Sequence, residues 1–153
     1  MTTFSSSVWD KLIEPALTPA GQLQPMRLTL EQYQRVIARD LESLLNTRIA
    51  TPAEALASYP ACRDSIVNFG LADFAQLCLS TAEDRKAICD GLTAAIIRHE
   101  PRLRHVRAQL VSEAGAINRL SFAISALLCA PSDEGRVRFG VRLEPSSLHY
   151  FIR

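Results

Sequence analysis

Lysine is nearly absent from this sequence of 153 residues. Lys11 and Lys86 are its only lysines, so almost all of its 17 basic residues are arginines. The formal net charge of +1 gives no support for a general nucleic-acid binder, because such proteins normally carry a basic excess. Arginine tolerates partly buried ion pairs and suits protein interfaces. A bias in genomic base composition would give the same pattern without any function, and the sequence does not separate the two explanations.

Long apolar runs are also absent. The longest ones, such as 94–97 and 126–130, are far too short to cross a bilayer, which predicts no membrane insertion. The N-terminus shows no basic region followed by an apolar run, so we expect a protein of the cytoplasm. Hydrophobic residues nevertheless make up 48% of the chain, enough for the core of one ordinary domain.

Metal-binding and cofactor-binding motifs are missing as well. The cysteines show no CxxC spacing, and we expect them to be reduced and mostly buried. The histidines have no metal-ligand spacing with any cysteine. No glycine-rich motif for a nucleotide or dinucleotide occurs. The sequence therefore predicts neither a metal nor a cofactor.

The prolines divide the chain into an arm and a domain. Residues 1–28 are predicted to form an N-terminal arm, because three prolines and a glycine between positions 15 and 25 prevent long regular structure. The arm carries a short apolar patch with Trp9 and Leu12, which we expect to anchor it on the domain or on a partner. Residues 29–153 are predicted to form a single domain.

The domain begins with a predicted amphipathic helix over residues 29–46. Apolar residues recur there at spacings of three and four, and Thr29 with Gln32 fits a capping box. A second helix is predicted from a cap at Ser80 or Thr81. It ends near residue 100, because the proline that follows disfavours helical geometry in the residue before it.

The hydrophobic period changes to two in the last third of the chain. Four stretches alternate apolar and polar residues: 106–110, 120–128, 137–143 and 148–152. Arginines occupy the alternate positions of the third stretch, which indicates a half-buried strand with a basic outer face. Helices followed by strands predict the α+β class, with the helices packed on one face of a small antiparallel sheet. The arginine-bearing face would look outward.

Glu100 is the obvious candidate for a catalytic acid. No second carboxylate stands at a spacing typical of a glycosidase pair, so we expect no catalytic residue and no enzymatic activity. Folding can still bring Asp73 or Asp90 next to Glu100, which leaves a peptidoglycan hydrolase as the alternative interpretation. The expected cytoplasmic location opposes this alternative, because an enzyme of the cell wall must leave the cytoplasm.

Glu100, Pro101 and Arg102 form a more informative group. Pro101 pushes the residue before it toward extended geometry, in which residues two apart point to the same side. Glu100 and Arg102 are therefore predicted to form a rigid pair of charges between helix and strand. Two interpretations fit: a solvated pair worth at most about 1 kcal/mol, or a preformed docking point for a partner of complementary charge. Spacing alone does not decide between them.

Several segments resemble those of a known family. In order along the chain, the sequence contains SVWDKL (7–12), RDLESLLNTR (39–48), SIVNFGLADF (65–74) and EPRL (100–103). Together they resemble the signature segments of TssE, the baseplate subunit of type VI secretion machines, whose family includes the lysozyme-like wedge proteins of contractile phage tails. The departures are mild: Phe69 replaces a tyrosine, Ala72 a proline and Lys11 an arginine.

The resemblance implies a small α+β wedge protein with a structural role in a cytoplasmic baseplate. Its implied partners are the wedge subunits TssF and TssG, the adaptor TssK nearby, and the contractile sheath, whose end starts on this subunit. Glu100, Pro101 and Arg102 would contact the wedge core. The C-terminal strands would offer an edge to sheath strands. The label "lysozyme-like" implies no muramidase activity.

Overall fold

The computed structural model forms two compact units, Met1–Arg39 and Asp40–Arg153, and the boundary between them falls within helix α2 (Leu30–Asn46). The structure describes residues 4–5, 27–52, 54–74, 81–111, 120–129, 135–144, 147 and 149–153. Trp9 and Leu12 lie outside these residues, so their role as anchors stays a prediction, as does an arm ending at residue 28.

The first unit contains a short two-stranded sheet. Strand β1 (Phe4–Ser5) pairs antiparallel with β2 (Arg27–Leu28). The ring of Phe4 stacks on that of Tyr33 in the first turns of α2, with centroids 4.5 Å apart and an interplanar angle of 11°. Both rings are buried.

Helix α2 begins with the predicted capping box. The backbone N–H of Thr29 donates to Oε1 of Gln32 at 2.8 Å, and the N–H of Gln32 donates to Oγ1 of Thr29 at 3.3 Å. The helix ends at Asn46, as predicted. Its buried side chains recur at spacings of three and four: Tyr33, Ile37, Leu41, Leu44 and Leu45.

Helix α3 (Ala82–His99) is the second predicted helix. The hydroxyl of Thr81 caps it by accepting from the N–H of Asp84 at 3.1 Å. Acidic residues fill its first turn and Arg98 and His99 its last turn, which complements the helix dipole. Its buried face consists of Ile88, Leu92, Ala95 and Ile96. Within the described residues, no helix is long and apolar enough to span a membrane.

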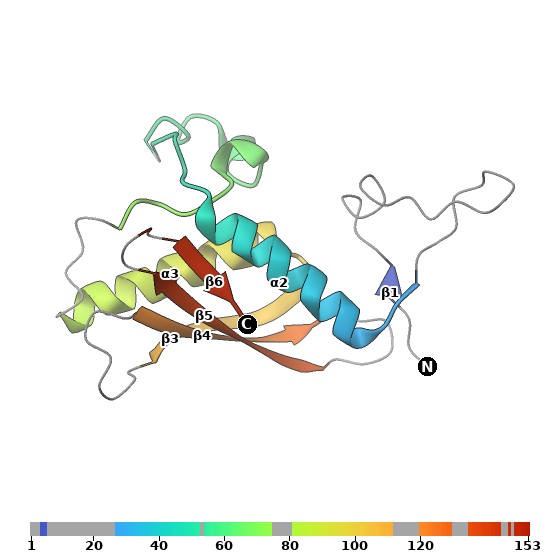
Figure 1. Ribbon diagram of the computed structural model, residues 1–153. Helices are drawn as coiled ribbons and strands as arrows, with labels where there is room; N and C mark the ends of the chain where they lie inside the picture. Colours follow the sequence, from blue (N-terminus) through green and yellow to red (C-terminus); the bar gives the residue numbers. More distant parts are fainter. Residues whose placement is uncertain are drawn as a thin grey trace, which may run out of the picture. The chain divides into compact units, whose positions relative to one another are not determined.

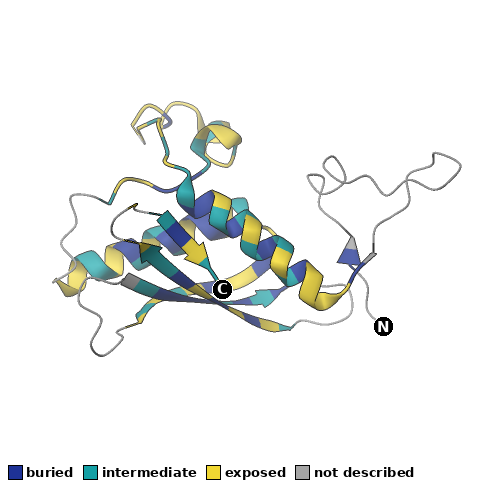
Figure 2. Ribbon diagram, viewed as in Figure 1, coloured by how far each residue is buried: buried dark blue, intermediate teal, exposed yellow. Residues whose placement is uncertain are grey.

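The second half of the chain forms the predicted antiparallel sheet. Its strands are β3 (Leu103–Val111), β4 (Leu120–Leu128), β5 (Arg136–Glu144) and β6 (His149–Ile152), and they lie in the order β3-β4-β5-β6 (Figure 1). One face of the sheet is buried, and helix α3 and the C-terminal end of α2 lie on that side (Figure 2). The α+β class, with helices on one face of the sheet, is confirmed.

Residues 54–69, here named the lobe, connect the two helical regions at the top of Figure 1. The lobe contains two 3₁₀ turns, Pro60–Cys62 and Ile66–Asn68. The chain then passes through Gly70, whose φ is +123°, and Leu71 forms an isolated β-bridge with Arg48, two residues after the end of α2. The N–H of Leu71 donates to the carbonyl of Thr47 at 2.8 Å. This bond attaches the chain after Gly70 to the residues that follow α2.

Candidate functional site

The Glu100–Pro101–Arg102 segment joins α3 to β3 through a tight turn. The N–H of Glu100 still donates to the carbonyl of Ile96, at 2.8 Å, so this residue ends the helix. The N–H of Leu103 then donates to the carbonyl of Glu100 at 3.1 Å. Glu100 has left helical geometry, with φ of −123° and ψ of 77°, but the chain turns at Pro101 and Arg102, so the prediction of an extended segment over the three residues is wrong. The proline fits the second position of such a turn.

The turn nevertheless brings the two predicted charges together. The guanidinium of Arg102 donates from Nε to Oε1 of Glu100 at 2.5 Å, and from Nη2 to Oε2. The backbone N–H of Arg102 adds a bond to Oε1 at 3.2 Å. Glu100 is only 4% exposed. The interpretation as a solvated surface pair is therefore wrong, because one partner is almost completely removed from water.

A third charge completes the group. Nη2 of Arg102 lies 2.7 Å from Oδ2 of Asp40, a residue of α2. Burial by itself would lower the pKa of Arg102, but the hydrogen bonds to Glu100 and then Asp40 outweigh it and raise that pKa. Glu100, Arg102 and Asp40 are named the charge triad below. The triad ties α2 to the junction of α3 and β3.

The geometry of the triad suits a fixed ion pair better than acid catalysis. Both carboxylate oxygens of Glu100 accept from Arg102, whereas a general acid needs its proton directed at a substrate. Asp90, one of the two carboxylates considered for a catalytic pair, forms an exposed ion pair with Lys86 at 2.7 Å. The carboxylate that does approach the turn is Asp40, which sequence reasoning missed.

The free edge of β6 is closed by two side chains of α2. Asn46 donates from Nδ2 to the carbonyl of Tyr150 at 2.9 Å and accepts from its N–H at 2.8 Å. The N–H of Ile152 donates to Oε2 of Glu42 at 3.2 Å. These backbone groups point away from β5, and on an open edge they would pair with an added strand.

The opposite edge, along β3, is closed in the same way by α3. The N–H of Ala108 donates to Oγ1 of Thr93 at 3.2 Å, and the N–H of Leu110 donates to the sulfur of Cys89. Ala108 and Leu110 are two residues apart in β3, a distance of about 6.8 Å along the strand. Thr93 and Cys89 are four residues apart in α3, which is about 6 Å along the helix axis. The similar lengths allow one helix side chain to face each of the two strand N–H groups. Burial raises the pKa of the Cys89 thiol, which keeps it protonated.

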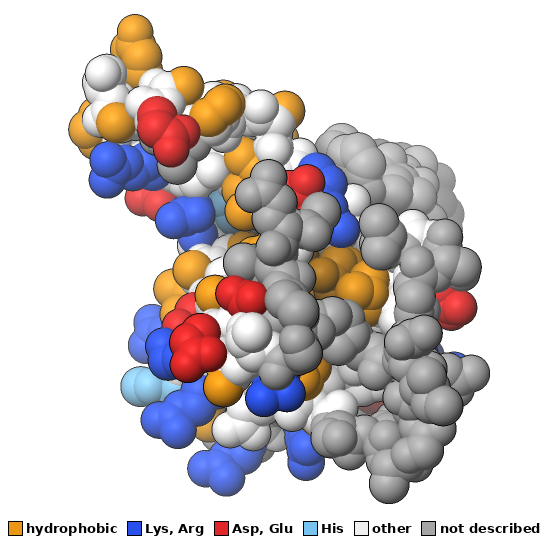
Figure 3. Space-filling model, turned by 90° about the vertical axis from the view of Figure 1, so that its left-hand side faces the viewer, with side chains coloured by type: hydrophobic (Ala, Val, Ile, Leu, Met, Phe, Trp, Pro, Cys, Tyr) orange, Lys and Arg blue, Asp and Glu red, His pale blue; other side chains and the backbone are white. Residues whose placement is uncertain are grey.

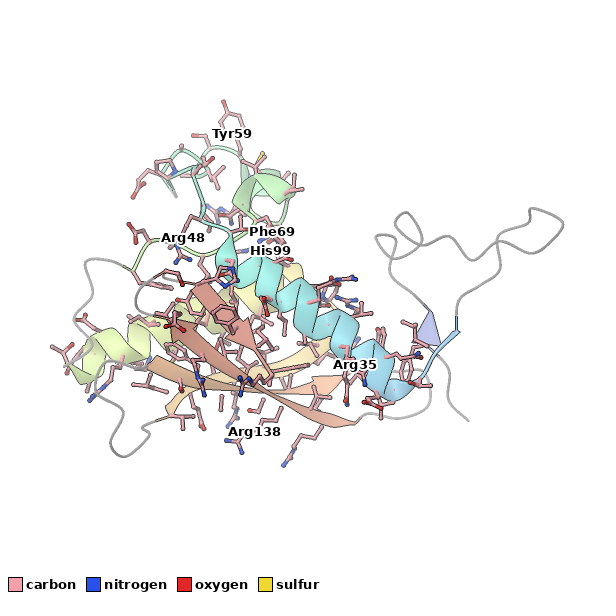
Figure 4. All side chains as sticks on the ribbon, in the orientation of Figure 1. Arg35, Arg48, Tyr59, Phe69, His99 and Arg138 are labelled. Carbon is pink, nitrogen blue, oxygen red and sulfur yellow. The ribbon has the colours of Figure 1, made fainter. Side chains whose placement is uncertain are left out.

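The third segment of the family resemblance, residues 65–74, contacts His99, the residue that precedes Glu100 of the triad. Nε2 of His99 lies 2.8 Å from the carbonyl oxygen of Asn68, and the rings of His99 and Phe69 meet edge to face at 5.3 Å (Figure 4). All three later segments of the resemblance therefore contribute to one network, which runs through α2, the base of the lobe and the turn before β3.

The outer part of the lobe exposes apolar side chains. Ile66 is 86% exposed and Tyr59 is 64% exposed, and Val67 lies beside Ile66 in the same turn. Figure 3 shows hydrophobic side chains gathered on the lobe at the top of the molecule, and Figure 4 labels Tyr59 at its tip. Exposed apolar groups of this kind mark protein contact surfaces more often than catalytic ones.

Comparison with known proteins identifies a family over most of these elements. The family model described as "Baseplate wedge protein gp25" matches residues 31–132, about two thirds of the chain. The match includes α2, the lobe, α3, the triad and β3. No curated protein matches the chain at a significant level. The chain therefore belongs to the baseplate wedge protein gp25 family, which is the family of TssE, and it has a structural role of the phage-baseplate type.

Proposed function

We propose that the chain is the TssE-type baseplate subunit of a type VI secretion machine, that it works in the cytoplasm and that it joins the baseplate wedge to the contractile sheath. The family match over residues 31–132 carries the proposal. The four segments that resemble TssE favour a secretion machine over a phage tail. The charge triad, with Glu100 buried, supports a structural role, because its charges pair with one another and hold α2 to the turn before β3.

In this proposal the wedge subunits TssF and TssG bind at the Glu100–Pro101–Arg102 turn, with the adaptor TssK nearby. Pro101 is exposed and the side chain of Arg102 is 22% exposed, so a partner can reach the turn. Glu100 and Asp40 hold the guanidinium in one orientation. The Arg102 side chain therefore loses little conformational entropy when a partner binds it, because it is already ordered.

The sheath would join through strand addition at the part of the sheet that remains open. The edges of β6 and β3 are occupied by side chains of α2 and α3. Strand β6 pairs only with residues 141–144 of β5, and Arg153 with Gly140. Residues 136–139 therefore have β4 on one side and no described strand on the other. A sheath strand would pair there, in line with β6.

We also propose that the chain is not an enzyme. The alternative is a peptidoglycan hydrolase, in which Glu100 acts as the acid. A zymogram with purified protein and peptidoglycan should show no clearing. Clearing by the wild type, lost in a folded Glu100→Gln variant, would establish the alternative.

Capture of purified TssF and TssG by the tagged chain tests the wedge contact. The neutral variant Asp40→Asn/Glu100→Gln/Arg102→Gln removes every charge of the triad but keeps groups that can form hydrogen bonds. Replacing all members of a buried ion group lowers the free energy of unfolding less than removing a single member, which would leave a buried charge without its partner. We expect this variant to fold and to capture at least about tenfold less of the two subunits, since a lost charged contact costs about 2–5 kcal/mol.

The matched control is Lys86→Gln/Asp90→Asn, which neutralises the exposed ion pair of α3. It should capture the wedge subunits like the wild type. Normal capture by the folded triad variant would exclude the turn as the docking point. No capture by the wild type would overturn the proposed function itself.

A further inference from the structure

The face of the sheet that points away from the helices is strongly basic. Strand register places the following arginines on it: Arg104, Arg107, Arg136, Arg138, Arg142 and Arg153. Among the described residues, Glu144 is the only acid on this face. The face thus has a large positive excess, although the formal charge of the whole chain is only +1. This basic face confirms the predicted outward side of β5.

These arginines have no charged partner in the part of the chain that the structure describes. None of them forms an ion pair with another described residue. Arg138 points away from the helices in Figure 4, and Figure 3 shows basic side chains along the same lower side. Like charges on one sheet face repel each other, so an acidic partner would gain from neutralising them.

The basic face is also hollowed. Its centre is formed by the small residues Ser121 and Ala123 of β4, with Ala123 directly opposite Gly140 of β5. An open hollow of about 510 Å³ lies over this pair. Val111 and Phe151, two partly exposed apolar side chains, stand at its border beside Arg138, Arg142 and Arg153. The hollow therefore has an apolar part and an arginine rim.

We propose that this face docks an acidic, amphipathic segment of a protein partner. Carboxylates of the segment would pair with the arginine forks of the rim, and its apolar side chains would cover Val111 and Phe151. The hollow favours a peptide over nucleic acid, because a phosphate backbone gains little from apolar side chains. The proposed function is needed only to say that the partner belongs to the same secretion machine. The docking itself is argued from the basic face.

The test measures binding of labelled peptides to the full chain by fluorescence anisotropy at low salt. The probes are an amphipathic helical peptide of Glu and Leu, the same peptide with Gln in place of Glu, and a short DNA duplex. We expect the acidic peptide to bind at least about tenfold more tightly than the Gln peptide. Added salt should weaken this binding, because exposed charges are screened.

Charge reversal identifies the face. Arg138→Glu/Arg142→Glu should weaken binding of the acidic peptide at least about tenfold, whereas Arg63→Glu/Lys86→Glu, with two reversals at exposed positions elsewhere, should bind like the wild type. If the reversal variant melts early, Arg138→Gln/Arg142→Gln gives the same comparison without new charge. Equal binding of the two peptides, or an equal loss in the control, would overturn the proposal.

Two further outcomes are also decisive. Tighter binding of the DNA duplex than of the acidic peptide would overturn the proposal in favour of a nucleic-acid surface. The peptide measurement does not depend on TssF or TssG. A failed wedge capture with intact peptide binding would therefore refute only the proposed function, and the reverse result would refute only the docking of an acidic segment on this face.

Discussion

The side-chain amide of Asn46 pairs with the backbone of Tyr150 through two hydrogen bonds, although 104 residues separate them. A primary amide presents a donor and an acceptor side by side, so it can replace a neighbouring strand at one residue. The same Nδ2 also donates to the carbonyl of Glu42 at 2.8 Å, which fixes the rotamer. One residue therefore ends helix α2 and closes the edge of the sheet.

Asn46→Asp tests this closure. The change removes the donor to the Tyr150 carbonyl and places a carboxylate against it, so we expect a loss of about 1–3 kcal/mol in the free energy of unfolding. Urea unfolding followed by circular dichroism measures it. Ser43→Ala, at an exposed position of the same helix, should change stability by less than about 0.5 kcal/mol. Equal stability of both variants would show that the edge bonds contribute nothing.

Arg102→Ala should destabilise the fold strongly. It leaves the Glu100 carboxylate buried without its partner, and breaking a buried ion pair in this way costs about 3–5 kcal/mol. A surface pair would cost no more than about 1 kcal/mol. Arg102→Lys should recover only part of the loss, since an ammonium cannot bind both oxygens as a fork. A melting temperature of Arg102→Ala equal to that of the wild type would contradict a stabilising ion pair at the buried Glu100.

Gly70→Ala should destabilise the base of the lobe. The φ of +123° is unfavourable for any residue with a Cβ, and an added Cβ would lie 2.5 Å from the carbonyl oxygen of Thr47. We expect a loss of at least about 1–3 kcal/mol, seen as a lower urea midpoint. Gly135→Ala is the control, because an added Cβ there meets no atom within 4 Å. Similar midpoints for the two variants would be the contrary result.

The free energy of unfolding should fall less at high pH in Tyr150→Phe than in the wild type. Burial raises the pKa of the Tyr150 phenol above its ordinary value of 10.0, and Arg48, over its ring, offsets this only in part. When the pH rises above 10.0, the Tyr150 phenol loses its proton in the unfolded chain before it does so in the folded protein. The unfolded chain then binds fewer protons, so the free energy of unfolding falls until the pH reaches the higher pKa of the folded state.

The measurement is the fall in urea midpoint between about pH 8 and about pH 11. It should be smaller for Tyr150→Phe than for the wild type. The exposed tyrosine variant Tyr59→Phe should keep the wild-type fall. An unchanged fall in Tyr150→Phe would mean that the phenol ionises equally easily in both states.

Ile66→Ser tests the lobe as a contact surface. The side chain is 86% exposed, so its loss should leave the melting temperature nearly unchanged. If the lobe binds a wedge subunit, capture of TssF and TssG should fall several-fold, as for the loss of a buried apolar anchor, about 1–3 kcal/mol. The matched control is Ile97→Ser, an exposed isoleucine of α3 outside the lobe. Equal capture by both variants and the wild type would exclude the lobe.

Local pattern was sufficient for much of the fold. The spacing of apolar residues predicted α2 and α3. Thr29 was predicted as the cap of α2 and Thr81 was one of two caps predicted for α3, because capping involves only residues three positions apart. Alternation predicted the strands of the sheet and its basic outer face, because every second residue of a strand points to the same side. The resemblance of four short segments pointed to the family that the comparison then showed.

The tertiary structure alone decided how the candidate site is built. Asp40 meets Arg102 across 62 residues, and Asn46 meets Tyr150 across 104, so no spacing within one element could reveal either contact. The burial of Glu100, which distinguishes a structural triad from a solvated pair, depends on the elements that surround the turn. Sequence by itself determined which faces are apolar and which are charged. Only packing determined which charges meet and which remain exposed, because water is excluded by the whole fold rather than by any one segment.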